Sequence, residues 1–272
     1  MARKKKAKPI ETNAPAVVRR WRKFFGLSCS HAAHVHRGAW EAALAFKRDL
    51  APDFTFHLGD FCDTTAFRRG RSGNEPRDPV EPDLVTGLCH LEQLEPNLVL
   101  CGNHEDRLWA HRESRNETVA FAAQQAVQMI HNEADRLHAE LVPYDGVWGG
   151  RMMGSAFLTH GTIYNVNAAR DMAEMYSGLP NLGHVIFGHT HTVATGTSRN
   201  AARVTGWNIG ALIDPGQMDY AKCRRQSMAW QNAWVSGEFS DNDCRPVITR
   251  FSPPETKLSI PHARHAHAHE TN

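Results

Sequence analysis

Five short segments of the chain bring together residue types that hold catalytic metal ions. They are "SCSH" (28–31), "GDFCD" (59–63), "GNHE" (102–105), "THG" (159–161) and "GHTH" (188–191). Each ends an apolar run of strand-like length, and the set offers imidazole, carboxylate and amide groups. Imidazole suits zinc and iron, whereas carboxylate also suits manganese and magnesium. Because thiolate is scarce, the mixture favours a hydrolytic ion over a closed, cysteine-rich structural zinc site.

A two-ion site needs one carboxylate that touches both ions. Two ions held about 3.5–4 Å apart need a bridging carboxylate and several terminal ligands. Asp60 is the natural bridge, because Gly59 lets the chain turn sharply after the preceding strand. Asn103 adds a neutral amide oxygen, and Gly102 again allows the turn.

The elements that must position these segments follow from periodicity. Strands are predicted over 22–29, 52–61, 97–105, 155–161 and 183–191, with hairpin patterns over 203–212 and 233–251. Helices are predicted over 37–50, 84–94 and 167–176, and 113–141 is predicted to form one long helix or two stacked ones. In open α/β sheets, sites collect at the carboxyl ends of strands, so we expect the polar segments to converge on a single site.

The remaining segments organise the chain around one α/β domain. The segment 68–83 is rich in Arg, Gly and Pro and is predicted to be a loop. We expect a disordered basic arm over 1–20, a single domain over 21–255, and a disordered, histidine-rich tail over 256–272.

Composition excludes several classes of protein. The 272 residues carry a net charge of only +2, so overall charge does not make the chain a polyanion binder. No apolar stretch approaches the ~18–20 residues of a membrane span, and no apolar region follows the basic start. The six cysteines are scattered without a CxxC pair, which is typical of a reducing compartment. We therefore expect a cytoplasmic protein without a membrane partner.

In order and type, the five segments resemble the motifs of the calcineurin-like metallophosphoesterase superfamily. Those motifs run D-x-H, G-D-x-x-D, G-N-H-[ED], a lone His often followed by Gly, and G-H-x-H, and the second to fifth stand intact over 59–191. The resemblance implies a four-layer αββα sandwich of two mixed β-sheets flanked by helices. It also implies two metal ions (Mn, Fe or Zn) and hydrolysis of a phosphomonoester or phosphodiester by attack of a metal-bridging hydroxide.

The resemblance also assigns roles to individual residues. The implied ligands are Asp60 as the bridge, His31 and His191 with the first-motif position on one ion, and Asn103, His160 and His189 on the other. His104 would not bind metal but would act as general acid or as a phosphate-stabilising group, with Asp63 orienting its imidazole. A carboxylate partner fixes the tautomer and raises the pKa of such a histidine, which keeps a proton available. Glu105 is expected to support the turn.

The first motif departs from the family pattern. This chain has Cys29-Ser30-His31 where the family has Asp-x-His. We take Cys29 as the ligand, because a coordinating thiol is deprotonated and thiolate suits zinc or iron better than manganese. Two alternatives stay open: Cys29 is a spectator and water fills the position, or His34 or His36 supplies the ligand.

The substrate is less defined by the sequence. Thr64-Thr65 follow the second motif, where Ser/Thr phosphoprotein phosphatases have Arg-Gly, so that branch is not expected. The C-terminal third, with "GWNIGALID" and "MAWQNAWVSGEF", resembles metallophosphoesterases of phages and prophages, which makes nucleic acid a candidate substrate.

Candidate phosphate-steering residues are Arg68, Arg69, Arg71 and Arg107, although each is as readily read as a plain surface charge. The alternative function is a non-catalytic binding scaffold with the same fold. A scaffold would be expected to lose the general acid or the bridging ligand, and this chain keeps Asp60, Asn103 and His104; the departure at Cys29 is the scaffold's only support.

Overall fold

The computed structural model describes residues 20–68, 79–217 and 225–252. The strands are β1 (Arg22–Leu27), β2 (Phe54–His57), β3 (Leu98–Leu100), β4 (Glu140–Val142), β5 (Gly150–Met153), β6 (Ala156–Thr159), β7 (His184–Phe187), β8 (Val193–Thr197), β9 (Thr205–Ile209), β10 (Ala233–Ser240) and β11 (Asp243–Arg250). The α-helices are α1 (Arg37–Leu50), α2 (Val80–Leu94), α3 (Asn103–His111), α4 (Glu117–Arg136) and α5 (Ala168–Tyr176). Short 3-10 turns are η1 (Ala32–His34), η2 (Thr65–Phe67), η3 (Pro215–Gln217) and η4 (Arg225–Ala229).

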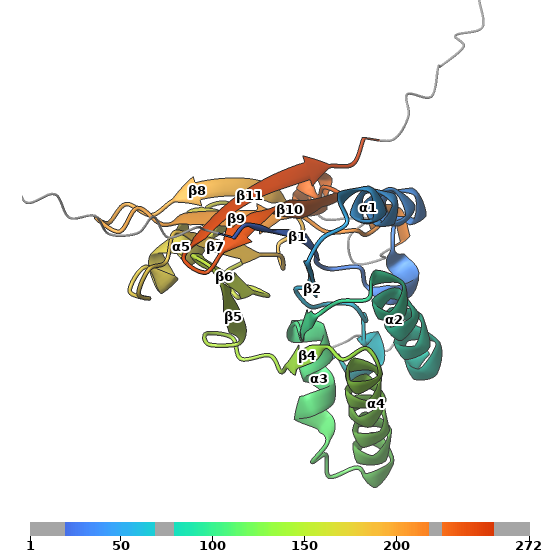
Figure 1. Cartoon of the computed structure of the whole chain (residues 1–272). Coiled ribbons are helices and arrows are strands. Elements are labelled where there is room, and N and C mark those ends of the chain that lie inside the picture. Colours follow the sequence, from blue (N-terminus) through green and yellow to red (C-terminus); the bar gives the residue numbers. More distant parts are fainter. Residues whose placement is uncertain (1–19, 69–78, 218–224, 253–272) are drawn as a thin grey trace, which may run out of the picture.

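Two mixed β-sheets form the centre of the molecule (Figure 1). The six-stranded sheet has the order β11-β10-β1-β2-β3-β4, in which β1 to β4 run parallel and β10 and β11 form an antiparallel hairpin. The five-stranded sheet has the order β5-β6-β7-β9-β8, with a parallel centre and an antiparallel strand at each edge. In both sheets, the carboxyl end of each parallel strand therefore leads into a connecting segment.

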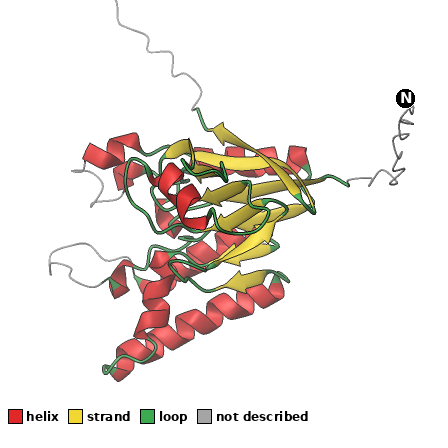
Figure 2. Ribbon diagram, turned by 90° about the vertical axis from the view of Figure 1, so that its left-hand side faces the viewer, coloured by secondary structure: helices red, strands yellow, loops and turns green. Residues whose placement is uncertain are grey.

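Side-chain alternation along the strands creates the layers. In β1, Phe24 packs between the sheets, whereas its neighbour Phe25 packs toward α1. The same alternation places Leu158 and Ile186 in the core between the sheets and turns Phe187 toward α5. Helices α1 to α4 cover the six-stranded sheet, and α5 covers the five-stranded sheet, as Figures 1 and 2 show. The predicted fold class, two mixed sheets flanked by helices, is confirmed.

The long helix predicted over 113–141 was wrong at its carboxyl end. Helix α4 starts after Asn116, whose side chain accepts hydrogen bonds from the backbone N–H groups of Thr118 and Val119, and it ends at Arg136. Residues 140–142 instead form β4, which pairs in parallel with β3. The pairing of this short strand with a central strand overrides its local helical pattern.

Two other boundaries differ from the prediction. The loop predicted over 68–83 ends earlier, because α2 already begins at Val80; residues 69–78 lie outside the described part of the chain. The "GNHE" segment, expected to be a turn, opens helix α3. That helix has nine residues and is mostly polar, so hydrophobic periodicity gave little sign of it.

Other expectations fall partly or wholly outside the described residues. The basic arm (1–20) is described only at Arg20, and the histidine-rich tail (256–272) is not described. The domain limits 21–255 stay a prediction. No helix among the described residues is long and apolar enough to cross a membrane.

The contact between β9 and α5 requires glycine at position 206. A Cβ atom there would lie 1.8 Å from the backbone oxygen of Ala169. We expect Gly206→Ala to lower the free energy of unfolding by about 1–3 kcal/mol, because the helix must move off the sheet. Urea unfolding followed by circular dichroism measures the change. Gly178→Ala is the matched control, since nothing lies within 4 Å of its Cβ position. Equal stability of both variants would contradict the close contact.

Candidate metal centre

The polar segments at the ends of five parallel strands meet at one place. The backbone N–H of Cys29 donates to the oxygen of Gly59 at 2.9 Å, which joins the loops after β1 and β2. The N–H of Gly188 donates to the oxygen of His160 at 3.1 Å, which joins the loops after β6 and β7. The structure brings together every residue predicted for the site: Cys29, His31, Asp60, Asp63, Asn103, His104, His160, His189 and His191.

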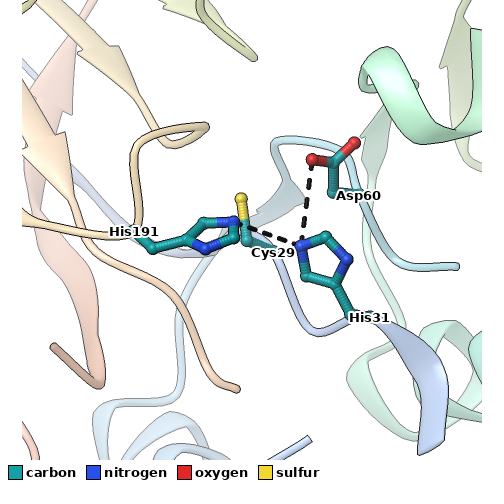
Figure 3. Close-up of side chains that lie close together, drawn as sticks. All are labelled: Cys29, His31, Asp60 and His191. Atoms are coloured by element: carbon teal, nitrogen blue, oxygen red, sulfur yellow. Dashed lines mark hydrogen bonds and ion pairs between the residues drawn. The ribbon is translucent and has the colours of Figure 1, made fainter. Parts of the chain in front are cut away.

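The first group of potential ligands is closed to solvent. Cys29, His31, Asp60 and His191 each offer one donor atom, and these atoms lie within 4.8 Å of one another. Figure 3 shows the four side chains pointing toward one another. Their exposed fractions are 0%, 0%, 1% and 5%. One sulfur, two nitrogens and one oxygen can satisfy a tetrahedral ion without water.

The imidazoles of this group have a spacing that suits a shared ion. His31 Nδ1 lies 3.0 Å from Asp63 Oδ1, and because a carboxylate only accepts, this nitrogen carries the proton. The lone pair of His31 Nε2 therefore points inward, 3.2 Å from His191 Nε2. Two nitrogen ligands of one tetrahedral zinc ion lie about 3.3 Å apart. This pair fits a transition-metal ion.

The second group shares Asp60 with the first and is open on one side. Asp60, His160 and His189 again place donor atoms within 4.8 Å of one another. Asn103 Oδ1 lies 3.1 Å from His160 Nε2 and 2.9 Å from His189 Nδ1, so its amide oxygen points to the same place. In contrast to the first group, Asn103 and His189 are partly exposed.

The orientation of His160 calls for a cation. Its Nδ1 donates to the backbone oxygen of Leu58 at 2.7 Å, so the neutral ring keeps its lone pair on Nε2. That lone pair faces Asp60 Oδ2 at 3.2 Å and Asn103 Oδ1 at 3.1 Å, both of which are acceptors. Burial opposes protonation of His160, but the Asp60 carboxylate outweighs it and raises the pKa of the imidazole. A proton or a metal ion relieves the repulsion.

The Asp60 carboxylate lies between the two groups. Its Oδ1 accepts from the backbone N–H of His104 at 3.0 Å. Its Oδ2 lies 3.2 Å from His160 Nε2 and 3.9 Å from the Nε2 atoms of His31 and His104. Burial disfavours the charge, but the neighbouring His104 and His160 outweigh it and hold the pKa of Asp60 well below its usual value. Asp60 therefore stays ionised at the position that a bridging ligand requires.

Asp63 binds two imidazoles at once. Its Oδ1 accepts from His31 Nδ1 at 3.0 Å and lies 3.1 Å from His104 Nδ1. Its backbone oxygen accepts from His104 Nδ1 and from Arg107 Nη1, both at 2.8 Å. Burial would raise the pKa of Asp63, but the hydrogen bonds from His104 and His31 outweigh it and lower the pKa strongly. The expected contact with His104 is present, and the contact with His31 was not anticipated.

His104 lies at the edge of the centre and is 9% exposed. Burial opposes its protonation, but the carboxylates of Asp60 and Asp63 outweigh burial and raise the pKa of the imidazole. With Nδ1 donating to Asp63, Nε2 is the nitrogen that faces Asp60. A protonated His104 can therefore donate a proton from Nε2.

Two buried carboxylates hold the loops in place. Glu105 accepts from the backbone N–H groups of Asp60, Cys62 and Gly102 at 2.7–2.8 Å, which is the expected support of the turn. Burial and the charge of Asp60 raise the pKa of Glu105 to about 7. Asp83, in the first turn of α2, accepts from the N–H groups of Asp63 and Thr64 at 3.0 and 2.8 Å. Sequence reasoning missed Asp83, because it had placed residues 80–83 in a loop.

The backbone is strained where the ligands lie. Among the described residues, five of the predicted ligands have a left-handed conformation, with positive φ angles: Cys29 (55°), His31 (48°), Asp60 (56°), His189 (68°) and His191 (61°). For residues with a Cβ atom, this conformation costs about 1 kcal/mol or more each. Such strain gathers at functional sites, so the backbone independently marks this centre.

The structure places the Cys29 thiol inside the first group. Its Sγ accepts from the backbone N–H of His189 at 3.3 Å and lies 3.1 Å from Ser28 Oγ. Burial and the charge of Asp60 raise the pKa of this thiol well above its usual value, an effect that a coordinated cation would reverse. Neither proposed alternative belongs to the first donor group. His36 Nδ1 accepts from Ala39 N–H and caps α1, and His34 Nε2 lies 4.0 Å from Asp63 Oδ2.

Aromatic rings surround the centre and were not anticipated. The ring centroids of Tyr144 and His160 are 5.9 Å apart, those of Tyr164 and His189 5.8 Å, and those of Trp230 and His191 4.5 Å. No motif identifies them, because each comes from a different loop. His57 is buried beside the loops of the site, with Nε2 3.3 Å from Ser30 Oγ and Nδ1 accepting from Gly59 N–H at 3.1 Å. Of the candidate phosphate-steering arginines, Arg69 and Arg71 lie outside the described residues.

Comparisons with known proteins give fold-level likenesses only. No protein-family model matches the chain, and no curated protein matches it. Among solved structures, it is similar to a dimetal phosphatase from Danio rerio (10% identity, 84% of this chain and 95% of that chain covered, TM-score 0.44). It is also similar to the phosphoesterase Yfce from E. coli (16% identity, 84% of this chain and 98% of that chain covered, TM-score 0.38). A third similar structure is Vacuolar Protein Sorting 29 from Cryptosporidium parvum (10% identity, 86% of this chain and 99% of that chain covered, TM-score 0.40). At these TM-scores, the similarities concern the fold and not the activity of this chain.

The double contact of Asp63 predicts a loss of metal binding on substitution. In Asp63→Asn, the amide no longer fixes the tautomer of His31, and we expect affinity for zinc to fall by about 10- to 100-fold. Competition with a chromogenic chelator measures the dissociation constant. Asp106→Asn, on the same helix as His104, is the matched control. An unchanged dissociation constant in a folded Asp63→Asn protein would show that Asp63 does not orient a ligand.

Proposed function

We propose that this chain is a calcineurin-like metallophosphoesterase with two metal ions, which hydrolyses phosphate esters. The observation that carries the proposal is the pair of donor groups that share the ionised Asp60 carboxylate. His104 supports the proposal, since it lies beside both groups with a raised pKa. It forms a third cluster with His31 and Asp63, in which both imidazoles turn Nδ1 to the Asp63 carboxylate and Nε2 toward Asp60. A shared carboxylate and an adjacent acid are what two-metal phosphoester hydrolysis needs.

In this proposal, each residue group holds one ion. Cys29, His31, Asp60 and His191 hold the first, and Asp60, Asn103, His160 and His189 hold the second. When bound, the ions lower the pKa of a water molecule and neutralise charge on the phosphoryl oxygens. The chain contributes rigid geometry, because the acceptors Asp63 and Leu58 fix the tautomers of His31 and His160.

His104 is the proposed general acid. Its Nδ1–H is held by Asp63, so the imidazole cannot rotate away from the centre. Against the effect of burial, the carboxylates of Asp60 and Asp63 raise its pKa and so favour the imidazolium form, which carries a proton on Nε2. That proton passes to the oxygen of the leaving group as the ester bond breaks. Arg107 Nη1 donates to the Asp63 backbone oxygen and stiffens the same loop.

The two ion positions are unequal. The first is closed, and its donors include a soft sulfur, which favours zinc or iron over manganese. The second is open past Asn103 and His189, so the phosphate group of the substrate enters on that side. Closed sites with four protein ligands are typical of tightly held ions, whereas open positions exchange ligands during catalysis.

The thiol at position 29 sets the metal preference. We expect wild-type protein, offered equal zinc and manganese, to take zinc at the first position, and Cys29→Asp to gain manganese. Elemental analysis after gel filtration gives the content of each metal, and Cys89→Ser, at an exposed cysteine, is the control. The same metal content in Cys29→Asp and wild type would show that the thiol is a spectator.

A hydrolysis panel tests the proposed activity. The substrates are p-nitrophenyl phosphate, bis-p-nitrophenyl phosphate and single- and double-stranded DNA, each with manganese, iron or zinc. We expect His104→Ala to lower kcat by about 10²- to 10⁴-fold, because the general acid is lost. His111→Ala, at the other end of α3, is the matched control and should retain activity. If wild type and His104→Ala are equally inert with every metal, the chain is a binding scaffold and not an enzyme.

The subfamily, the substrate class and the cellular location are proposed from the sequence alone. The C-terminal third supports a phage-type member acting on nucleic acid as a phosphodiesterase, and the scattered cysteines support a cytoplasmic location. The panel separates diesterase from monoesterase activity directly.

A further inference from the structure

An exposed tyrosine stands beside the open ion position. Tyr164 is 50% exposed, and its ring centroid lies 5.8 Å from that of His189, with the two rings at 81°. An exposed aromatic side chain alone is ordinary on a protein surface. Tyr164, however, contacts His189, a partly exposed residue of the second ligand group. Its position beside the metal centre therefore suggests a role in that centre.

The segment that carries Tyr164 is fixed on both sides. Before it, Ile163 packs on the core beneath α5. After it, Asn165 Nδ2 donates to Asp171 Oδ2 at 3.1 Å, and Asn165 Oδ1 accepts from the N–H of Asn167 at 2.7 Å. The ring is therefore presented by an ordered connection between β6 and α5, which reduces the entropy lost when a ligand packs against it.

The closed first position leaves the substrate one direction of approach. Cys29, His31 and His191 are at most 5% exposed, so a phosphate group reaches the centre past Asn103, His104 and His189. The organic part of the ester then extends outward along this side. Tyr164 lies next to His189 on this side, where its aromatic ring can contact the organic group of the phosphate ester.

We propose that Tyr164 determines specificity by stacking on a flat ring in the ester group of the substrate, so that the preferred substrates are phosphate esters of nucleotides. This inference rests on the proposed phosphoesterase function. Stacking between a base and an aromatic side chain tolerates any sequence and contributes about 5- to 150-fold in affinity per base. A free nucleotide ester and a nucleotide in a single strand present the same ring.

Two esters with the same leaving group test the inference. They are thymidine 5′-(p-nitrophenyl phosphate) and methyl p-nitrophenyl phosphate, which differ only in the group retained on phosphorus. We expect wild type to favour the thymidine ester by about tenfold or more in kcat/KM, mainly through KM. Tyr164→Leu should abolish that preference and leave the methyl ester unchanged, whereas Tyr164→Phe should retain it. Phe121→Leu, at an exposed ring on α4, is the matched control.

The outcomes separate the two proposals. If neither ester is hydrolysed with any metal, the proposed function fails. If both esters are hydrolysed but wild type shows no preference, or Tyr164→Leu keeps the preference, the function stands and the stacking role is wrong. A structural role of Tyr164 would lower kcat/KM for both esters equally, which also contradicts the proposal. Oligothymidylate assayed in parallel shows whether the strand or the free nucleotide ester gains more from the ring, and either result supports stacking.

Discussion

The buried, ionised carboxylate of Asp60 is the interaction on which the rest of the centre depends. It is 1% exposed, and its Oδ2 is approached by the Nε2 atoms of three histidines, two from loops and one from the first turn of α3. A buried carboxylate is costly unless cations or donors surround it. The loops after β1, β2, β3 and β6 therefore converge on Asp60, and Glu105 holds the backbone of Asp60 in its left-handed turn.

The Asp63 carboxylate links two imidazoles of the centre. One oxygen contacts both the His31 imidazole, in the first ion position, and the His104 imidazole, at the edge of the second. A change in the protonation or position of either histidine therefore affects the other through the shared Asp63 oxygen. In the proposed mechanism, the closed first position would hold its ion, and the ester would react at the open second position.

The sequence was most informative where chemistry and strand ends coincide. Within each sheet, the polar segments after β2 and β3, and after β6 and β7, could be expected to meet because parallel strands place their carboxyl ends together. The resemblance to the family motifs joined the two pairs into one site. Contacts between distant loops could not be read in this way: Asp83 binding the Asp63 turn, or Tyr164 beside His189, depends on tertiary packing. The strand β4 was missed for the same reason, since pairing with β3 decides its conformation.

Anomalous scattering from crystals grown with zinc or manganese shows whether two ions share Asp60. If they do, each chain has two peaks, one among Cys29, His31, Asp60 and His191, and one among Asp60, Asn103, His160 and His189. In Asp60→Asn both peaks should weaken together. A single peak that avoids Asp60, or two peaks of unchanged height in Asp60→Asn, would contradict the account.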